Sequence, residues 1–558
     1  MTRGLRTRSA VLGAVAMVAA LALSACQGSA NNAGGGGGGS GGGGGKTLTI
    51  QGDAGNPTLV KNFNPFASTQ LGGTRLIYEP LEIPSQVDGS FQPFLSTGFK
   101  APDATTLEYA IRDGVKWSDG KDFTSADVLF TFNLLKKFPA LDVFGVWQFM
   151  SGVTASGSTV TVKLKTPNIP AATTISATPI VPEHLWSSVT DPVKYVNADP
   201  VGTGPFTLDT YADTQYQLKK DDKYWQADKV APSTVVFPAQ SSNQATNQLD
   251  VSAGKFDWSY NFIPDVKKTY VDKDAKTNIY WFPPGGTIAL YPNHTKAPFN
   301  DVNFRKGLSL AIDRQTIETK AVNGYTAPAS QSGLILPNLE KFLDPSIPDK
   351  GVVKPDLAGA KAAFAKAGYT MQGTQLMKGG KQAAMTILAP ASYSDWVAAA
   401  TEVKNQLGAA GITVTLNLPQ PAAYQQAIQS GNFEVAMGGY GGTGNVYNDF
   451  NNTFNSEFAT PINTPTVNNF ERFKNPQMDA ALKELAAATE MPAQEKAAHQ
   501  LEQLMYDQVP IVAMYYGGSW GLFRTGNFTG WPSADDPYTL PTPYNNAVLV
   551  VVTHLKAA

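Results

Sequence analysis

The segment LEYAIRDGVKWSDG, which runs from Leu107 to Gly120, decides the fold of this chain. Gly114 and Gly120 are expected in turns on either side of a short strand that carries Trp117. A tryptophan in such a setting is more often a core residue than a binding residue, so we assign Trp117 to the core. The segment therefore predicts strands joined by tight turns around an aromatic core.

The residues that follow this segment predict a helix. The sequence Thr124-Ser125-Ala126-Asp127 resembles a capping box, in which two side chains bond the free backbone N–H groups of a helix start. Apolar residues then recur at helical spacing, at Val128, Leu129, Phe132 and Leu135.

Strands and helices are mixed along the rest of the chain without a fixed repeat. Strands are predicted at residues 46–50, 159–164, 206–218 (a hairpin), 412–418, 433–437 and 511–515. Helices are predicted from 301 or 303 to 312, from 356 to 368, from a capping Asp395 to 411, from 475 onward, and from 492 to 506. This mixture predicts a multi-lobed α/β body.

Composition and charge exclude several classes of protein. The chain has 558 residues, 42% hydrophobic and 16% charged, so it can form a large core and is not expected to be disordered in bulk. Its net charge is −2. No cluster of lysine and arginine stands out after the first residues, so a nucleic-acid partner has no electrostatic support.

The N-terminus indicates the location of the protein in the cell. A basic region with Arg3, Arg6 and Arg8 precedes an apolar run over residues 11–23, which is too short to span a membrane comfortably. That run ends in Leu23-Ser24-Ala25-Cys26, which resembles the bacterial lipobox and holds the single cysteine of the chain. The alternative is a free, buried Cys26 after an ordinary signal peptide. We expect a signal peptide over 1–25 and a lipidated Cys26 that anchors the protein at the outer face of the cytoplasmic membrane.

A glycine-rich tract follows the cysteine. Residues 28–45 hold two long runs of glycine, at 34–39 and 41–45, which cannot bury apolar surface. The tract predicts a flexible tether over 26–45, with an end-to-end distance of roughly 23 Å.

Several short motifs together resemble bacterial extracytoplasmic solute-binding proteins of family 5, which serve oligopeptide, dipeptide, nickel and some oligosaccharide ABC importers. The motifs occur in order: LIYEPL at 76–81, the opening segment with Asp127-Val128, GTGPF at 202–206, DKYW at 222–225, Pro298-Phe299 with Arg305, AIDR at 311–314, AGY at 367–369 and AGI at 410–412. Each motif alone is weak, whereas their order and spacing are specific. We expect Asp313 and Arg314 to be a buried or capping pair rather than ligand contacts.

The resemblance implies an α/β, two-lobed periplasmic-binding-protein-like fold (type II, cluster C) with an extra subdomain and a hinge that closes on a ligand. It implies lobe one from residues 46–82, 200–296 and 510–558, an additional subdomain from 83–199, and lobe two from 297–509. The implied partners are ABC permease subunits in the membrane, with the protein itself a monomer. No cofactor and no enzymatic activity are expected.

The solute class is predicted from one loop and from a finer resemblance. Peptide-binding family members usually place an aspartate after a strand of lobe two, whereas the loop Gly438–Asn445 has no acid before Asp449. An ammonium group buried without a carboxylate partner would be costly. Other segments resemble the cellobiose and β-glucoside binders, namely 61–66, 136–142, 395–396, 469–473 and 531–538.

We therefore predict a neutral, β-linked oligosaccharide as the solute, with an oligopeptide or dipeptide as the alternative. Sugars need aromatic platforms together with amide, hydroxyl or backbone partners. The candidate binding residues are Asn64, Trp147, Trp396, Tyr440, Asn445 and Trp520.

Two further motifs, one catalytic and one nucleotide-binding, occur in the sequence. Gly517-Gly518-Ser519-Trp520-Gly521 matches a nucleophile elbow, but the residues after it do not predict the helix that a secreted hydrolase would need. Residues 439–444 match a dinucleotide fingerprint, but residues 445–455 do not predict an opening helix. The four histidines are not closely paired, so a metal site is not expected.

Overall fold

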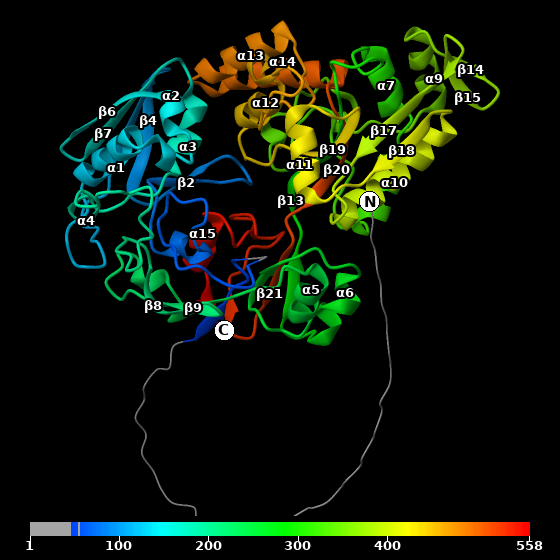
Figure 1. Cartoon of the computed structure of the whole chain (residues 1–558). Helices are drawn as coiled ribbons and strands as arrows, with labels where there is room; N and C mark the ends of the chain where they lie inside the picture. The colour runs from blue at the N-terminus through cyan, green and yellow to red at the C-terminus, as the bar shows by residue number, and fades with distance from the viewer. Residues whose placement is uncertain (1–45, 54–55) are drawn as a thin grey trace, which may run out of the picture. The chain divides into compact units, whose positions relative to one another are not determined.

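The computed structural model describes residues 46–53 and 56–558, which form one compact unit (Figure 1). The predicted signal peptide, the lipidated Cys26 and the tether lie outside the described residues. Within them, the fold is the predicted mixed α/β, two-lobed one, with several separate sheets. No helix of the described part is long and apolar enough to cross a membrane.

Lobe one contains two sheets. The first has the order β1(Thr47–Thr49)-β10(Thr234–Pro238)-β9(Gln215–Lys220)-β8(Phe206–Ala212), with β1 parallel to β10. The second has the order β11(Trp258–Tyr260)-β21(Gly521–Arg524)-β12(Asn278–Trp281). Helices α5(Gln244–Ser252), α6(Val266–Thr269) and α15(Ala547–Val552) and the small pair β22(Phe528–Thr529)-β23(Lys556–Ala557) complete this lobe. The predicted hairpin at 206–218 is confirmed as β8 and β9.

The two ends of the described body meet on lobe one. Lys46 Nζ donates a hydrogen bond to the backbone oxygen of Ala558 at 2.6 Å, and β1 runs beside the C-terminus in Figure 1.

The additional subdomain is an antiparallel sheet covered by short helices. Its sheet has the order β4(Ser96–Asp103)-β5(Thr106–Ile111)-β7(Thr159–Leu164)-β6(Met150–Ser156). The remaining elements are β2(Glu82–Pro84), β3(Phe91–Pro93), α1(Ser125–Lys137), α2(Val146–Phe149), α3(Ala172–Ser176) and α4(Glu183–Trp186). The predicted capping box at Thr124 is confirmed. Trp117 is 1% exposed, so its assignment to the core is confirmed.

Lobe two is built on a five-stranded sheet of order β18(Thr413–Asn417)-β17(Ala384–Leu388)-β19(Val435–Tyr440)-β13(Pro284–Pro292)-β20(Val512–Gly518). Its helices are α7(Val302–Leu310), α8(Arg314–Val322), α9(Leu357–Lys366), α10(Ser394–Ala409), α11(Pro421–Ser430), α12(Val446–Phe454), α13(Pro476–Ala487) and α14(Met491–Gln508). A small sheet, β14(Thr370–Gln372)-β15(Gln375–Lys378)-β16(Lys381–Gln382), flanks them.

Local capping chemistry explains most of the helix starts in lobe two. The side chains of Asp301, Asp313, Asp356 and Asn475 each accept a backbone N–H bond at the start of α7, α8, α9 and α13. Arg314, next to the capping Asp313, is 1% exposed. The buried and capping roles predicted for this pair are therefore confirmed.

Three local predictions were wrong. Asp395 does not cap α10, because Tyr393 occupies the cap position without a side-chain bond and Asp395 lies in the first turn. Strand β19 runs on to Tyr440, since Gly438 and Gly439 pair with β13 instead of forming a loop. Residues after Asn445 do open a helix, α12, and the Asn445 side chain caps it.

The lobe boundaries also differ from those expected. Strands β13 and β20, predicted to belong mainly to lobe one, pair with each other and with β19 in the sheet of lobe two. The chain therefore passes between the lobes near Phe282-Pro283 and Ser519-Trp520 rather than near 296 and 510. The two crossings touch, because the Ser519 N–H donates to the Pro283 carbonyl at 2.7 Å.

Candidate functional site at the junction of the lobes

Aromatic side chains surround the two crossing segments. Trp520 is half-buried, and its ring lies 5.0 Å from the ring of Phe282 and 5.1 Å from that of Phe262. Tyr325 comes from lobe two, yet its hydroxyl accepts the backbone N–H of Val266 in lobe one at 2.7 Å. The crossings are thus embedded in an aromatic cluster to which both lobes contribute.

Neutral amides and phenols lie beside this cluster, at the ends of two strands of lobe one. Gln51 follows β1 and is 2% exposed, and its Oε1 accepts hydrogen bonds from the Tyr260 N–H and the Asn261 amide. The Tyr260 ring packs edge-on against Tyr544 at 5.1 Å. Tyr544 itself is 48% exposed, so one aromatic face at the junction is free to meet a solute.

One glutamine connects three separate parts of the molecule. Gln86, in the loop between β2 and β3, accepts a hydrogen bond from the Asn545 amide at 3.0 Å and donates one to the Gly442 carbonyl of lobe two at 3.0 Å. The side chains named at this junction, from Gln51 to Asn545, are all neutral. The junction therefore offers hydrogen-bonding and stacking groups rather than charges.

The glycines of the loop that follows β19 allow very close packing against neighbouring segments. Gly441, Gly442 and Gly444 have φ values of +70°, +87° and +76°. A Cβ atom on Gly442 would lie 1.9 Å from the Gly285 carbonyl oxygen, and one on Gly444 would lie 2.4 Å from the Ser85 carbonyl oxygen. The loop therefore requires glycine for packing against β13 of its own lobe and against the subdomain.

The chain itself satisfies the N-terminus of α12. The Asn445 side chain accepts the Asn448 N–H at 3.1 Å, and the carboxylate of Asp449 accepts the Thr443 N–H at 3.0 Å and its hydroxyl at 2.6 Å. Burial raises the pKa of Asp449 to about 6. With these acceptors in place, the fingerprint at 439–444 does not form a phosphate cradle.

The serine motif is also explained by the fold. Gly517 and Gly518 end β20, and Gly521 begins β21, so Ser519 sits in a strand–turn–strand crossing. A nucleophile elbow needs a strand–turn–helix. In the described part of the chain, no group of three or more metal-ligating side chains is close enough to hold an ion.

Three of the six predicted binding residues lie at or beside the junction, and three lie elsewhere. Trp520 belongs to the crossing, and Tyr440 and Asn445 flank the glycine loop. Tyr440 is 2% exposed, and its hydroxyl has no hydrogen-bond partner among residues 46–53 and 56–558.

The other three have structural contacts of their own. Asn64 is fully buried, with its amide donating to the Pro192 and Tyr195 carbonyls. Trp147 lies in the additional subdomain and donates its indole N–H to the Phe132 carbonyl at 2.7 Å. These bonds give Asn64 and Trp147 structural roles, and their part in solute binding stays a prediction. Trp396 is half-buried on lobe two, with its ring 5.3 Å from Tyr393 and 6.3 Å from Tyr424.

Sequence reasoning missed most of the junction. Gln51, Gln86, Tyr260, Tyr544 and Asn545 were not predicted, because nothing in their local sequence marks them. The only available signal was the run Pro543-Tyr544-Asn545-Asn546, where an aromatic residue meets two amides outside any predicted strand or helix.

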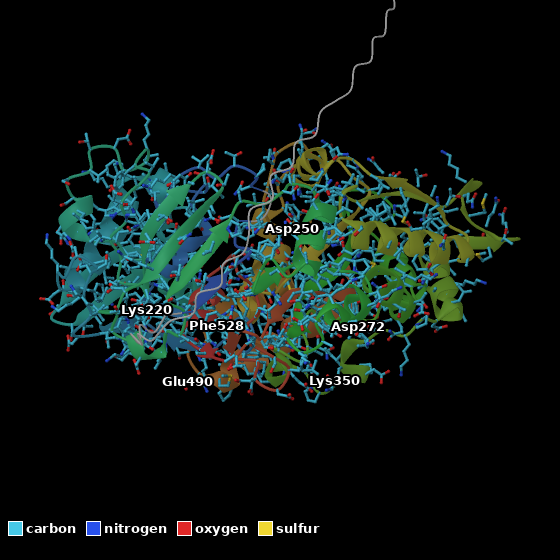
Figure 2. All side chains as sticks on the ribbon, turned by 90° about the horizontal axis from the view of Figure 1, so that it is seen from below. Lys220, Asp250, Asp272, Lys350, Glu490 and Phe528 are labelled. Carbon is cyan, nitrogen blue, oxygen red and sulfur yellow. The ribbon has the colours of Figure 1, made fainter. Side chains whose placement is uncertain are left out.

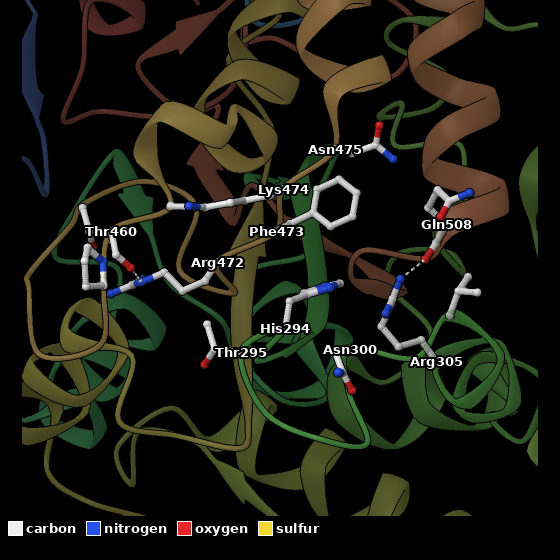
Figure 3. A pocket seen from close by; sticks show the side chains of 13 residues that line it. His294, Thr295, Asn300, Arg305, Thr460, Arg472, Phe473, Lys474, Asn475 and Gln508 are labelled. Atoms are coloured by element: carbon white, nitrogen blue, oxygen red, sulfur yellow. Dashed lines mark hydrogen bonds between the residues drawn. The ribbon is translucent and has the colours of Figure 1, made fainter. Parts of the chain in front are cut away.

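A more strongly charged pocket lies on lobe two, away from the junction (Figure 3). It has a volume of about 620 Å³ and is lined by Arg305, Arg472 and His294, among others. Arg305 donates to three backbone carbonyls and Arg472 to five, so both guanidinium groups fix surrounding loops. Burial lowers the pKa of His294 to about 3, which keeps its ring neutral. Figure 2 shows that two other charged side chains, Asp250 of lobe one and Lys350 of lobe two, lie well apart from each other.

The fold and this junction define the class of two-lobed solute-binding proteins. The chain matches the family described as bacterial extracellular solute-binding proteins, family 5 Middle, over residues 90–461. It belongs to that family.

Individual relatives agree at the level of the fold. The chain is 24% identical to the periplasmic murein peptide-binding protein MppA of Escherichia coli K12 over 454 residues, which cover 76% of this chain and 80% of MppA. It is similar to a Thermotoga maritima protein described as a periplasmic oligopeptide-binding protein, with a TM-score of 0.83, 24% identity and coverage of 92% and 99%. A second structure of that protein, with mannohexaose bound, gives a TM-score of 0.74, 24% identity and coverage of 92% and 98%.

Proposed function

We propose that this chain is the solute-binding subunit of an ABC importer and that it carries a neutral, β-linked oligosaccharide at the junction of its lobes. The observation that carries this proposal is the neutral character of the junction, where Gln51, Gln86, Asn261 and Asn545 supply amides beside the half-exposed ring of Tyr544. Sugars present hydroxyl groups and an apolar face, which match amides and aromatic rings.

The glycine loop itself offers no free carboxylate, which argues against a peptide. The nearest acid of the glycine loop, Asp449, is 2% exposed and already accepts two bonds from Thr443. A peptide ammonium group would need a carboxylate that it could reach. The mannohexaose-bound structure of the Thermotoga relative supports a sugar for this fold.

An oligopeptide remains the second candidate. MppA is described as binding murein peptides, and other relatives are described as oligopeptide-binding proteins. Asparagine and glutamine side chains can also bind a peptide backbone.

We further propose that the protein acts as a monomer anchored through Cys26, that its lobes close about the crossings at 282–283 and 519–520, and that it releases its solute unchanged. Two acyl chains would give stable anchoring, whereas one would give only weak binding. Replacement of Cys26 by serine should abolish lipid labelling of the protein.

The deciding experiment is a thermal-shift screen of cello-, manno- and xylo-oligosaccharides beside di- to pentapeptides. A solute that binds only the folded state stabilises it by about 2.7 kcal/mol at a hundredfold excess over Kd. We expect an oligosaccharide to raise the melting temperature and the peptides to leave it unchanged. A response to peptides alone would overturn the solute class. Cleavage of the bound oligosaccharide would overturn the transport role.

A further inference from the structure

The additional subdomain and lobe two touch directly, without lobe one between them. Lys341 of lobe two donates from Nζ to the Asp88 carbonyl of the subdomain at 2.7 Å, and Gln86 donates to the Gly442 carbonyl. The short 3₁₀ turn at Ile169–Ala171 packs against α13, and α13 lies next to the subdomain in Figure 1. These three contacts come from different elements, so they enclose space between the two bodies.

That space is a cavity with a volume of about 210 Å³, with walls from both bodies. The subdomain contributes the rings of Phe91 and Phe99, which lie 5.0 Å apart, and lobe two contributes Phe342, Tyr447 and Leu485. Met491, at the start of α14, also lines the cavity and is 45% exposed. Aromatic and aliphatic side chains therefore dominate the lining.

The charged groups of this lining are already engaged. The Lys341 ammonium is held by the Asp88 carbonyl, and the Asp88 carboxylate accepts the Ser90 N–H at 3.0 Å and its hydroxyl at 2.7 Å. The Asn445 side chain caps α12, and the Gln494 amide donates to the Ala488 carbonyl. Lys341 and Asp88 carry opposite charges, so an ionic ligand would meet one like and one opposite charge and gain little net attraction, whereas an uncharged ligand would lose little on entering.

We propose that this cavity is an accessory binding site for a small, uncharged, apolar molecule with a single aromatic ring. A cavity of about 150 Å³ lined by Leu, Ile and Phe is known to hold benzene, so 210 Å³ suits one ring with a short polar substituent. Because the walls belong to two bodies, an occupant stabilises the arrangement in which the subdomain and lobe two touch. This site adjoins the junction, since Asn445 lines the cavity and lies beside the junction, but it does not depend on the solute class proposed there.

In the test, 4-fluorobenzyl alcohol is the probe. The whole protein is titrated with it, and binding is followed by fluorine NMR. A ligand of this size is expected to bind with a Kd on the order of 1 mM. Its charged analogues, 4-fluorobenzoate and 4-fluorobenzylammonium, should bind at least about tenfold more weakly, because each loses its hydration and meets both charges of the lining, one of them of its own sign.

A matched pair of variants on α3 locates the site. Thr173 lines the cavity, whereas its neighbour Thr174 does not, and both are partly exposed. Thr173→Phe should fill the cavity and weaken binding of the alcohol by about tenfold or more. Thr174→Phe should leave the Kd of the alcohol within about twofold of the value for the unaltered protein. Equal weakening in both variants, or none in either, would overturn the proposal.

A second readout does not rely on a filled cavity. With ¹³C-methyl methionine labels, the alcohol should shift the methyl signal of Met491, which Met491→Leu identifies by its loss. An unmoved Met491 signal at saturating alcohol, or equal binding of the charged analogues, would overturn the proposal even if Thr173→Phe failed to fold.

Discussion

The lobe junction and the interior of lobe two use polar groups in opposite ways. At the junction, amides and phenols are neutral, and the ring of Tyr544 is half-exposed. Inside lobe two, ionisable side chains such as Arg314 and Glu471 are buried almost completely. The difference separates a framework held by buried ionisable groups from a junction where the named side chains are neutral.

The buried arginines of lobe two hold the backbone in place through hydrogen bonds to its carbonyl groups. Arg314 donates to the carbonyls of Ala513, Ser309 and Val353 at 2.8 to 3.1 Å, which ties α8 to strand β20. Arg305 donates to the carbonyls of Gln508 and Val509, at the C-terminus of α14, where helix carbonyls lack partners. Each guanidinium group thus replaces several backbone hydrogen bonds at once.

The buried carboxyls are held in their neutral form. Glu471 is fully buried, and its two oxygens have no hydrogen-bond partner within the described ranges. Burial raises the pKa of Glu471 to about 8 and that of Glu502 to about 8. Strongly shifted pKa values often mark binding sites, but these two groups lie in the interior of lobe two.

The largest expected effect is a loss of stability when a buried arginine of lobe two is replaced. Arg314→Met should lower the free energy of unfolding by about 3–5 kcal/mol, because it leaves buried carbonyls without a donor. Chemical denaturation measures this loss. Arg524→Met is the control, since Arg524 is about one-third exposed beside Asp274 and should cost about 1 kcal/mol or less. Equal losses in both variants would remove the distinction between the two regions.

The second effect is a pH dependence of stability. The folded state of Glu471 keeps its proton up to about pH 8, whereas an unfolded glutamate loses it near 4.5. The folded state therefore binds more protons between these values, and stability falls as pH rises from about 4.5 to about 8.

Glu471→Gln should remove that part of the dependence. We expect a gain of about 1–3 kcal/mol at pH 8.5 and little change near pH 4.5, measured by denaturation at both pH values. Glu457→Gln, at an exposed position, serves as the control. A variant that loses stability at high pH would contradict the neutral state of Glu471.

The third effect belongs to the junction. Tyr544→Ala should weaken solute binding by about 5- to 150-fold, equivalent to about 1–3 kcal/mol, and leave the melting temperature nearly unchanged. Tyr393→Ala is matched to it, because Tyr393 is 44% exposed but lies at the start of α10 in lobe two. Calorimetric titration with the solute found in the screen should separate the two variants. Unchanged affinity in Tyr544→Ala would show that the solute does not contact this ring.

The smallest expected effect on solute binding follows from loss of the hydrogen bonds that connect Gln86 to Asn545 and to Gly442, which we call the bridge. Gln86→Ala and Asn545→Ala should each weaken solute binding by about fivefold, near 1 kcal/mol. The two side chains share a hydrogen bond, so the double variant should lose less affinity than the sum of the single losses. Strict additivity would show that the bridge is not coupled to binding.

The sequence predicted what depends on neighbouring residues and missed what depends on distant ones. The caps at Thr124, Asp301 and Asp356 were predictable because a cap bonds to N–H groups two or three positions away. The extension of β19 was not, because Gly438 and Gly439 pair with a strand about 150 residues earlier.

The candidate site shows the same limit more strongly. Gln86 and Asn545 are 459 positions apart in the chain, and Gln86 and Gly442 are 356 apart. Trp396, by contrast, looked suitable from its local sequence but is packed between two tyrosines. Residues that meet only through the fold carry no local pattern, so their function becomes visible only in three dimensions.

The hydrogen bond between Lys46 and Ala558 has a practical consequence for engineering. Fluorescent proteins fused to these two ends would sit together on lobe one and would hardly change their distance when a solute is captured. A second fluorescent protein could instead be inserted into an exposed loop of lobe two, such as the turn at Gly379-Gly380. One fluorophore would then lie on each lobe, so the proposed closure of the lobes would change their distance and turn solute capture into an optical signal.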